Sequence, residues 1–158
     1  MNKRLALRAQ LALIPLFVGS IGAEALAYLL CLELGRLYPE TATFAPAYAV
    51  GALLATTFLQ AALVALWLIL RRAARGQFFS PATARLFTVI RRLVLAAAAV
   101  LVAGGAYLLF VARTGGPGVL LATAATVAVA AAFDQLAAVA RAALVEAAEY
   151  RAELEAVI

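Results

Sequence analysis

This chain of 158 residues contains no histidine and a single cysteine, Cys31. Without histidine, neither a Ser–His catalytic pair nor a histidine-ligated zinc site can form. One cysteine excludes an internal disulfide bond. The acidic residues show no cluster at metal-ligand spacing, and no glycine-rich phosphate-binding loop precedes a helix. We therefore expect no enzyme, no cofactor and no metal site.

Charged residues are also scarce. They make up 13% of the chain, and 67% is hydrophobic, whereas soluble domains contain about 25% charged residues. A helix needs about 20 apolar residues to cross a bilayer, and four runs reach that length: 9–35, 46–70, 93–112 and 118–140. These runs are too long and too rich in alanine and leucine for barrel strands, so they should span lipid as helices. The sequence predicts one domain, an all-α integral membrane four-helix bundle.

The first run begins after basic residues and contains Ala23-Glu24-Ala25, which imitates a signal peptide with its cleavage site. However, the apolar stretch continues well past this point. It is also longer than the apolar core of a processing signal. We interpret the run as an uncleaved first helix.

Positive residues are distributed unevenly between the two sides of the predicted bundle. Nine lie at the N-terminus or in the second connection, whereas the other two connections contain only Arg36 and Arg113. Because short cytoplasmic loops carry the excess of Lys and Arg, we expect both termini and the second connection in the cytoplasm. The net charge of +5 fits attraction to anionic lipid. Direct nucleic-acid binding is not expected, because the basic residues are split between membrane-flanking segments.

The second connection, 71–92, carries the strongest local signals. Gly76 can end a helix, and Ser80-Pro81 can start one, with the serine oxygen as the cap. We expect a helical cytoplasmic elbow, from which the next helix enters the bilayer near Leu93. This elbow is either held by lipid phosphates or docks a partner. Its candidate contact residues are Arg71, Arg72, Arg75, Phe78, Phe79, Arg91 and Arg92.

The fourth run has no stop signal at the inner membrane surface, so a cytoplasmic C-terminal helix should extend it over 141–158. Glu146, Glu149 and Glu153 form an acidic stripe on this extension. The stripe is either a solvated face or a contact for the elbow arginines or a basic partner, and we expect one of these acids to approach an elbow arginine. An apolar seam should pack on the preceding helix or on a second subunit: Ala143, Ala147, Tyr150 and Leu154.

Three polar side chains should lie inside the bilayer: Glu24, Gln60 and Asp134. A charge at mid-depth costs about 2.5–3.5 kcal/mol on insertion scales. Such an acid can join helices as a protonated or paired group, act in a proton or cation relay, or face a water-filled crevice. We expect Asp134 to face the bundle and to meet Arg91, Arg92 or Gln60, because an arginine has a long stem that tolerates lipid depth.

Several motifs occur in the order seen in a known bacterial family. They are Ile14-Pro15, Leu37-Tyr38-Pro39, Gly76-Gln77-Phe78-Phe79-Ser80, Pro117-Gly118 and the ending Glu153-Leu154-Glu155-Ala156-Val157-Ile158. Over nearly its full length the chain resembles the four-helix membrane proteins classed as domain of unknown function 2975, although Ala156 and Val157 replace the family's usual leucine and threonine. The resemblance implies a bacterial inner (cytoplasmic) membrane location. No catalytic residues are known for the family, so the resemblance assigns none to this chain. Genes of this family often lie beside a Cro/Xre-type helix-turn-helix regulator, which implies a membrane-bound sensor or anti-regulator.

Two functional hypotheses remain. The first is a non-enzymatic regulatory or interaction protein that holds a cytoplasmic partner, such as the helix-turn-helix regulator. The alternative is a subunit of a small-solute or ion transporter or channel that uses Glu24 or Asp134. That alternative needs a homo-oligomer, because four helices of this length rarely enclose a pore alone. Membrane lipids are expected partners under both hypotheses.

Overall fold

The computed structural model describes the backbone of residues 3–38, 42–78, 80–113 and 116–156, and the side chains of residues 7–38, 42–78, 80–113 and 116–150. Nearly all of this is helical. The long helices are α1 (Lys3–Leu37), α3 (Ala45–Ala74), α4 (Pro81–Ala106) and α5 (Pro117–Ala156). A short π-helical segment, η1 (Tyr107–Val111), extends α4. The predicted all-α fold of four long helices is confirmed.

Each of these helices is long and apolar enough to cross a membrane. The segments concerned are Leu7–Leu37, Ala45–Ala74, Pro81–Val111 and Pro117–Tyr150. The shortest has 30 residues, which at about 1.5 Å per residue cover about 45 Å, more than the ~30 Å of hydrocarbon. The chain is therefore a multi-pass membrane protein whose helices also reach into the headgroup layers.

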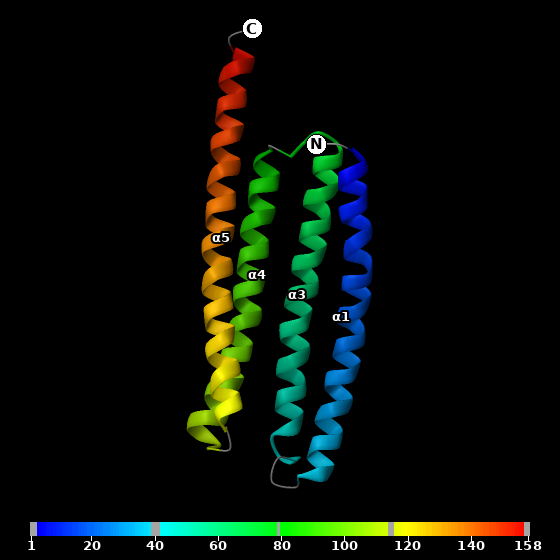
Figure 1. The fold of residues 1–158 in the computed structure, drawn as a ribbon, viewed down its shortest axis with the longest axis vertical. Coiled ribbons are helices and arrows are strands. Elements are labelled where there is room, and N and C mark those ends of the chain that lie inside the picture. Colours follow the sequence, from blue (N-terminus) through cyan, green and yellow to red (C-terminus); the bar gives the residue numbers. More distant parts are fainter. Residues whose placement is uncertain (1–2, 39–41, 79, 114–115, 157–158) are drawn as a thin grey trace.

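The four helices stand side by side in a row that follows the order of the chain (Figure 1). α1 packs on α3, α3 on α4, and α4 on α5. Within the described residues, α1 contacts neither α4 nor α5. The assembly is therefore an open layer, and both of its faces are available to lipid.

Small side chains allow these helices to pack closely. The buried positions of α3 are Ala49, Ala55, Ala62, Ala65, Ile69 and Ala73. Lipid tails are as apolar as leucine, so helix association in a membrane depends on close packing, which small residues allow. Larger residues lie on the lipid-facing surface; Leu121 and Val129, for example, are 70% and 68% exposed.

The elbow ends α3 as predicted. Gly76 has a φ of 75°. Its N–H donates to the carbonyl of Ala73 at 3.1 Å, and the N–H of Gln77 donates to the carbonyl of Arg72 at 3.0 Å. This pair of bonds is a Schellman motif, in which the left-handed residue is usually glycine. Pro81 then begins α4, which confirms the expected helix start.

A buried threonine holds the elbow against the start of α4. The Thr83 hydroxyl donates to the carbonyl of Gln77 at 3.3 Å and lies 3.1 Å from the Ser80 hydroxyl. Thr83 is 0% exposed. The expected cap by the Ser80 side chain is wrong: Ser80 has the extended backbone of a cap residue but makes no side-chain cap bond. Its hydroxyl is engaged by Thr83 instead. Phe78 is half-buried, and Phe79 lies outside the described residues.

At the opposite end of the layer, α4 and α5 approach each other at Gly105. A Cβ at this position would overlap the Thr123 hydroxyl and lie 3.2 Å from the Thr123 Cβ. No such obstacle lies within 4 Å of the neighbouring Gly104. Gly105 therefore permits the close contact between the two helices. Pro117 begins α5 as predicted.

α5 continues without a break to Ala156 and projects well beyond the other three helices (Figure 1). The predicted extension past residue 140 is thus present. The predicted packing of the seam on α4 is wrong: Leu144 is buried, whereas Ala143 and Tyr150 are exposed. Packing of the seam on a second subunit stays a prediction. Successive residues on a helix differ by about 100° in direction, so a contact face that contains Leu144 turns Ala143 to its side. The side chain of Leu154 lies outside the described residues.

Candidate functional site

A salt bridge between α4 and α5 marks the start of the candidate site. The Arg91 Nε donates to Asp134 Oδ1 at 2.5 Å, and Arg91 Nη2 donates to Oδ2 at 2.9 Å. Two parallel bonds of this kind fix both the position and the orientation of the guanidinium. The side chains are partly shielded, with 40% of Arg91 and 19% of Asp134 exposed. Asp134 therefore meets one of its expected partners.

The charge pattern places this pair at the edge of the hydrocarbon. From Leu93 to Ala112 the chain carries no charge, and 20 helical residues cover about 30 Å, the thickness of the hydrocarbon. Arg91 lies just before this stretch. The residues of α4 that precede Arg91, and the residues of α5 that follow Asp134, consequently belong to the headgroup layer and the adjoining water.

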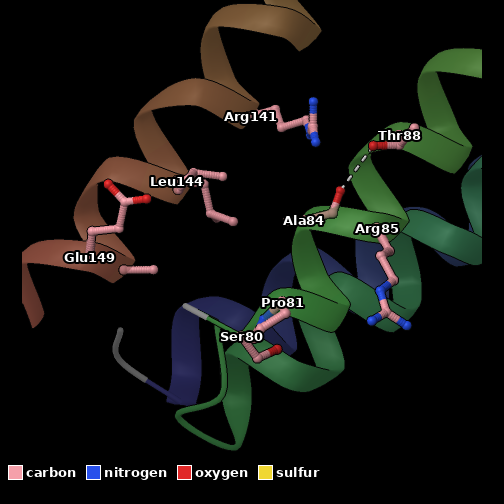
Figure 2. Close-up of a pocket in the computed structure, with 10 residues that line it drawn as sticks. Ser80, Pro81, Ala84, Arg85, Thr88, Arg141, Leu144 and Glu149 are labelled. Carbon is pink, nitrogen blue, oxygen red and sulfur yellow. Dashed lines mark hydrogen bonds between the residues drawn. The ribbon is translucent and has the colours of Figure 1, made fainter. Parts of the chain in front are cut away.

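Beyond the pair, α4 and α5 border a groove. Its volume is about 370 Å³. Figure 2 shows Leu144 of α5 pointing into the space between the helices, and Thr88 on the opposite wall. The groove is lined by Ser80, Pro81, Ala84, Arg85, Thr88, Arg141, Leu144, Val145, Ala148 and Glu149.

Two arginines lie at the same height along this groove. Arg85 precedes Arg91 by six residues and Arg141 follows Asp134 by seven, so each lies about 9–10 Å beyond the salt bridge. Arg141 extends from α5 toward α4, whereas the guanidinium of Arg85 points away from α5 (Figure 2). Within the described residues, neither arginine forms an ion pair.

The predicted contact between the acidic stripe and the elbow is absent from the described residues. Glu146 and Glu149 are exposed, and neither forms an ion pair there. Glu146 lies about 200° around the helix from Leu144, which faces α4, so its side chain leaves on the far side. Glu149 lies about 140° around the helix from Leu144, at the rim of the groove. In addition, three of the six elbow arginines (Arg71, Arg72 and Arg75) lie at the end of α3, which α5 does not contact within the described residues. The side chain of Glu153 lies outside the described residues.

The other intramembrane candidates are not brought together. Glu24 is half-buried on α1, which packs only on α3 within the described part of the chain. The side-chain nitrogen of Gln60 on α3 is buried and has no hydrogen-bond partner among the described residues. Gln60 is therefore not the partner of Asp134.

The basic candidates of the elbow are mostly open to solvent. Arg71, Arg75 and Arg92 are exposed and Arg72 is half-buried. Within the described residues, none of these four forms an ion pair. No group of three or more His, Cys, Asp or Glu residues in the described part of the chain could hold a metal ion.

Sequence reasoning missed Arg141 and Leu144 as site residues, and it gave Arg85 no role of its own. A signal was present. Leu144 follows Ala137 by seven residues and precedes Ala148 by four, which is the spacing of one helix face. Several alanine-rich faces of α5 have the spacing of a contact face. The sequence therefore does not distinguish the Leu144 face from the Ala143 face, and only the packing of α5 on α4 does.

Comparison with known proteins shows the relationship of the chain and leaves its activity open. No protein with a curated functional description matches it. No solved structure matches it. One family model matches residues 29–158, which includes the elbow, the groove and the whole of α5. This match covers most of the sequence, although it begins after Ile14-Pro15. The chain belongs to the family described as Protein of unknown function (DUF2975).

Proposed function

We propose that this chain is a non-enzymatic interaction protein of the bacterial cytoplasmic membrane, which holds a soluble regulatory partner at the elbow end of its helix layer. One observation carries the proposal: α5 projects far beyond the other helices (Figure 1). A transmembrane anchor needs only about 20 residues in the bilayer, and α5 has 40. The excess length provides a surface for a soluble partner.

The orientation in this proposal follows from the basic residues. The N-terminus, the elbow and the C-terminal end of α5 all lie at one end of the layer (Figure 1). The excess of Lys and Arg belongs to that end, and such an excess marks the cytoplasmic side. The surface on α5 would then be accessible to a cytoplasmic protein.

The chemistry of the projecting surface indicates the kind of partner. Glu146 and Glu149 are exposed and unpaired within the described residues, and Tyr150 beside them is 60% exposed. An acidic surface with an exposed aromatic residue suits a basic protein surface. A DNA-binding helix-turn-helix regulator, the partner implied by the family resemblance, carries such a surface. Binding there would compete with DNA and make this chain an anti-regulator.

The transporter or channel alternative receives less support. Asp134 is bound to Arg91 through both carboxylate oxygens, and a relay requires a carboxylate that can exchange its proton. A single row of four helices also offers no central pathway. A pore would need several copies of the chain. Because Asp134 is engaged by Arg91, Glu24 would have to act as the intramembrane acid of such a pore.

The test is a pull-down of the purified helix-turn-helix regulator by the detergent-solubilised protein. The full chain should retain the regulator, and a chain that lacks residues 145–158 should not. The double reversal Glu146→Lys and Glu149→Lys should also abolish binding. The matched reversal Glu33→Lys and Glu40→Lys, on the predicted outer side, should leave binding unchanged. Equal retention by the truncated and full chains would refute the proposal.

A further inference from the structure

We propose that the groove between α4 and α5 is a binding site for one anionic phospholipid of the adjacent leaflet, with its phosphate held by Arg141 and Arg85. The site is independent of the soluble partner proposed above.

The two arginines of the groove start a few Å on the water side of the lipid phosphates. Arg91 and Asp134 lie at the hydrocarbon edge, and Arg85 and Arg141 lie about 9–10 Å beyond them along their helices. A bilayer of ~40–45 Å contains ~30 Å of hydrocarbon, which leaves about 5–8 Å of headgroup layer on each side. An arginine side chain spans several Å and bends toward the interface. Guanidiniums from Arg85 and Arg141 can therefore reach the phosphate plane.

The net charge of the groove favours an anionic lipid headgroup. The lining of the groove contains two arginines and one carboxylate, that of Glu149, which leaves one net positive charge. Both arginines lack an ion pair within the described residues. A phosphate diester flanked by two guanidiniums accepts charge-assisted hydrogen bonds from both. A lipid with one negative charge, such as phosphatidylglycerol, complements the site.

The wall of the groove suits the rest of the lipid. Thr88 lies about one turn nearer the bilayer than Arg85, so the glycerol region and the acyl chains leave the groove past Thr88. Leu144, Val145 and Ala148 lie on the water side of Arg141 and border the headgroup. A volume of about 370 Å³ falls within the range of small-molecule sites, ~300–1,000 Å³. Basic pockets between helices at the cytoplasmic membrane surface are typical sites for anionic lipid headgroups.

The two arginines should contribute unequally. Arg141 already extends across the groove, whereas the guanidinium of Arg85 points away from α5 (Figure 2). Arg85 must change its side-chain rotamer to reach a phosphate held by Arg141, and ordering a long side chain opposes binding through lost entropy. Arg141 is therefore the main anchor.

Native mass spectrometry can measure the affinity for the first bound lipid. The purified protein in detergent is titrated with phosphatidylglycerol, phosphatidylethanolamine or phosphatidylcholine at ~0.15 M salt, where distant surface charges are screened. Phosphatidylglycerol should bind most tightly. Arg141→Gln should weaken its binding by about fivefold, the effect expected for one arginine near a lipid surface, and Arg85→Gln should weaken it by less. Arg141→Lys should retain part of the preference.

Arg75→Gln is the matched control. Arg75 is an exposed elbow arginine outside the groove, and its replacement removes the same charge, so phosphatidylglycerol binding should change by less than about twofold. An equal loss in Arg75→Gln and Arg141→Gln would overturn the site, because it would indicate general attraction. Equal affinity for the three lipids would overturn it as well.

A second measurement needs no variant and remains valid if Arg141→Gln fails to fold. Phenylglyoxal modifies accessible arginines, and peptide mass spectrometry locates the products. Phosphatidylglycerol should protect Arg141 and Arg85 in the wild-type protein and leave Arg75 reactive. Phosphatidylcholine, and inorganic phosphate at the same concentration, should protect none of them. Protection by inorganic phosphate alone, or equal protection of Arg75, would contradict a lipid site.

Discussion

Arg91 of α4 binds Asp134 of α5 through two hydrogen bonds, and the two residues lie 43 positions apart in the chain. Among the described residues this is the one ion pair that joins two helices; the other, between Arg36 and Glu33, lies within α1. Within the described part of the chain, α5 packs only on α4 and its extension η1. The pair therefore sets the register of α5 against the rest of the layer, and with it the shape of the groove.

The first prediction concerns this pair. Asp134→Leu leaves a guanidinium without its partner at the hydrocarbon edge, and Arg91→Leu leaves a carboxylate there. An unpaired charge in such a place is more destabilising than the loss of both charges. We expect each single variant to lower the melting temperature in detergent more than the double variant does. The corresponding double-mutant cycle on exposed Arg36 and Glu33 should show almost no coupling between the two residues. Additive effects at Arg91 and Asp134 would contradict the prediction.

The second prediction tests the contact at the other end of α4 and α5. Gly105→Ala would force a Cβ into the Thr123 hydroxyl, and overpacking of this kind typically costs about 1–3 kcal/mol. Thermal unfolding should show this loss. Gly104→Ala, with no atom within 4 Å of the added Cβ, should leave stability unchanged or raise it slightly, because alanine favours helices. Adding Thr123→Ala to Gly105→Ala should restore part of the loss. Similar melting temperatures for the two glycine variants would contradict the close approach.

The third prediction concerns the elbow. Gly76→Ala places a Cβ on a residue with a φ of 75°, which should destabilise the protein by about 1–2 kcal/mol. Gly76→Asn should cost less, since asparagine tolerates the left-handed region better. Gly118→Ala, in the first turn of α5 and with nothing near its added Cβ, serves as the control. Equal stability of the Ala and Asn variants at Gly76 would show that the left-handed turn does not limit stability.

The fourth prediction tests orientation. After replacement of Cys31 by alanine, one cysteine is placed at Thr43 in the outer connection or at Gln77 in the elbow; both positions are exposed. A membrane-impermeant maleimide should label the Thr43 variant in intact cells and label the Gln77 variant only after permeabilisation. The excess of basic residues on the elbow side is the physical reason. The reverse labelling pattern would place the elbow and both termini outside the cytoplasm.

The sequence alone was sufficient to predict the elements of this fold. Hydrophobic runs long enough to span a bilayer must be helical because lipid leaves backbone groups no other partner. Gly76, Pro81 and Pro117 act through their own backbone geometry. The residue types at these three positions were therefore enough to predict where one helix ends and two helices begin. The contact between Asp134 and Arg91 was expected because a charge inside lipid requires a partner.

The lateral arrangement was decided by tertiary packing. Hydropathy places a helix in lipid and is nearly the same all round an alanine-rich helix such as α5, so it cannot select Leu144 over Ala143 as the contact residue. That choice depends on where α4 and α5 can approach, which Gly105 and the Arg91–Asp134 pair determine together. The same packing turns Glu146 away from α4, leaves Glu149 at the rim of the groove and brings Arg141 to the height of Arg85. Composition determined that this protein lies in a membrane, and the rotation of α5 determined which of its charged residues share a site.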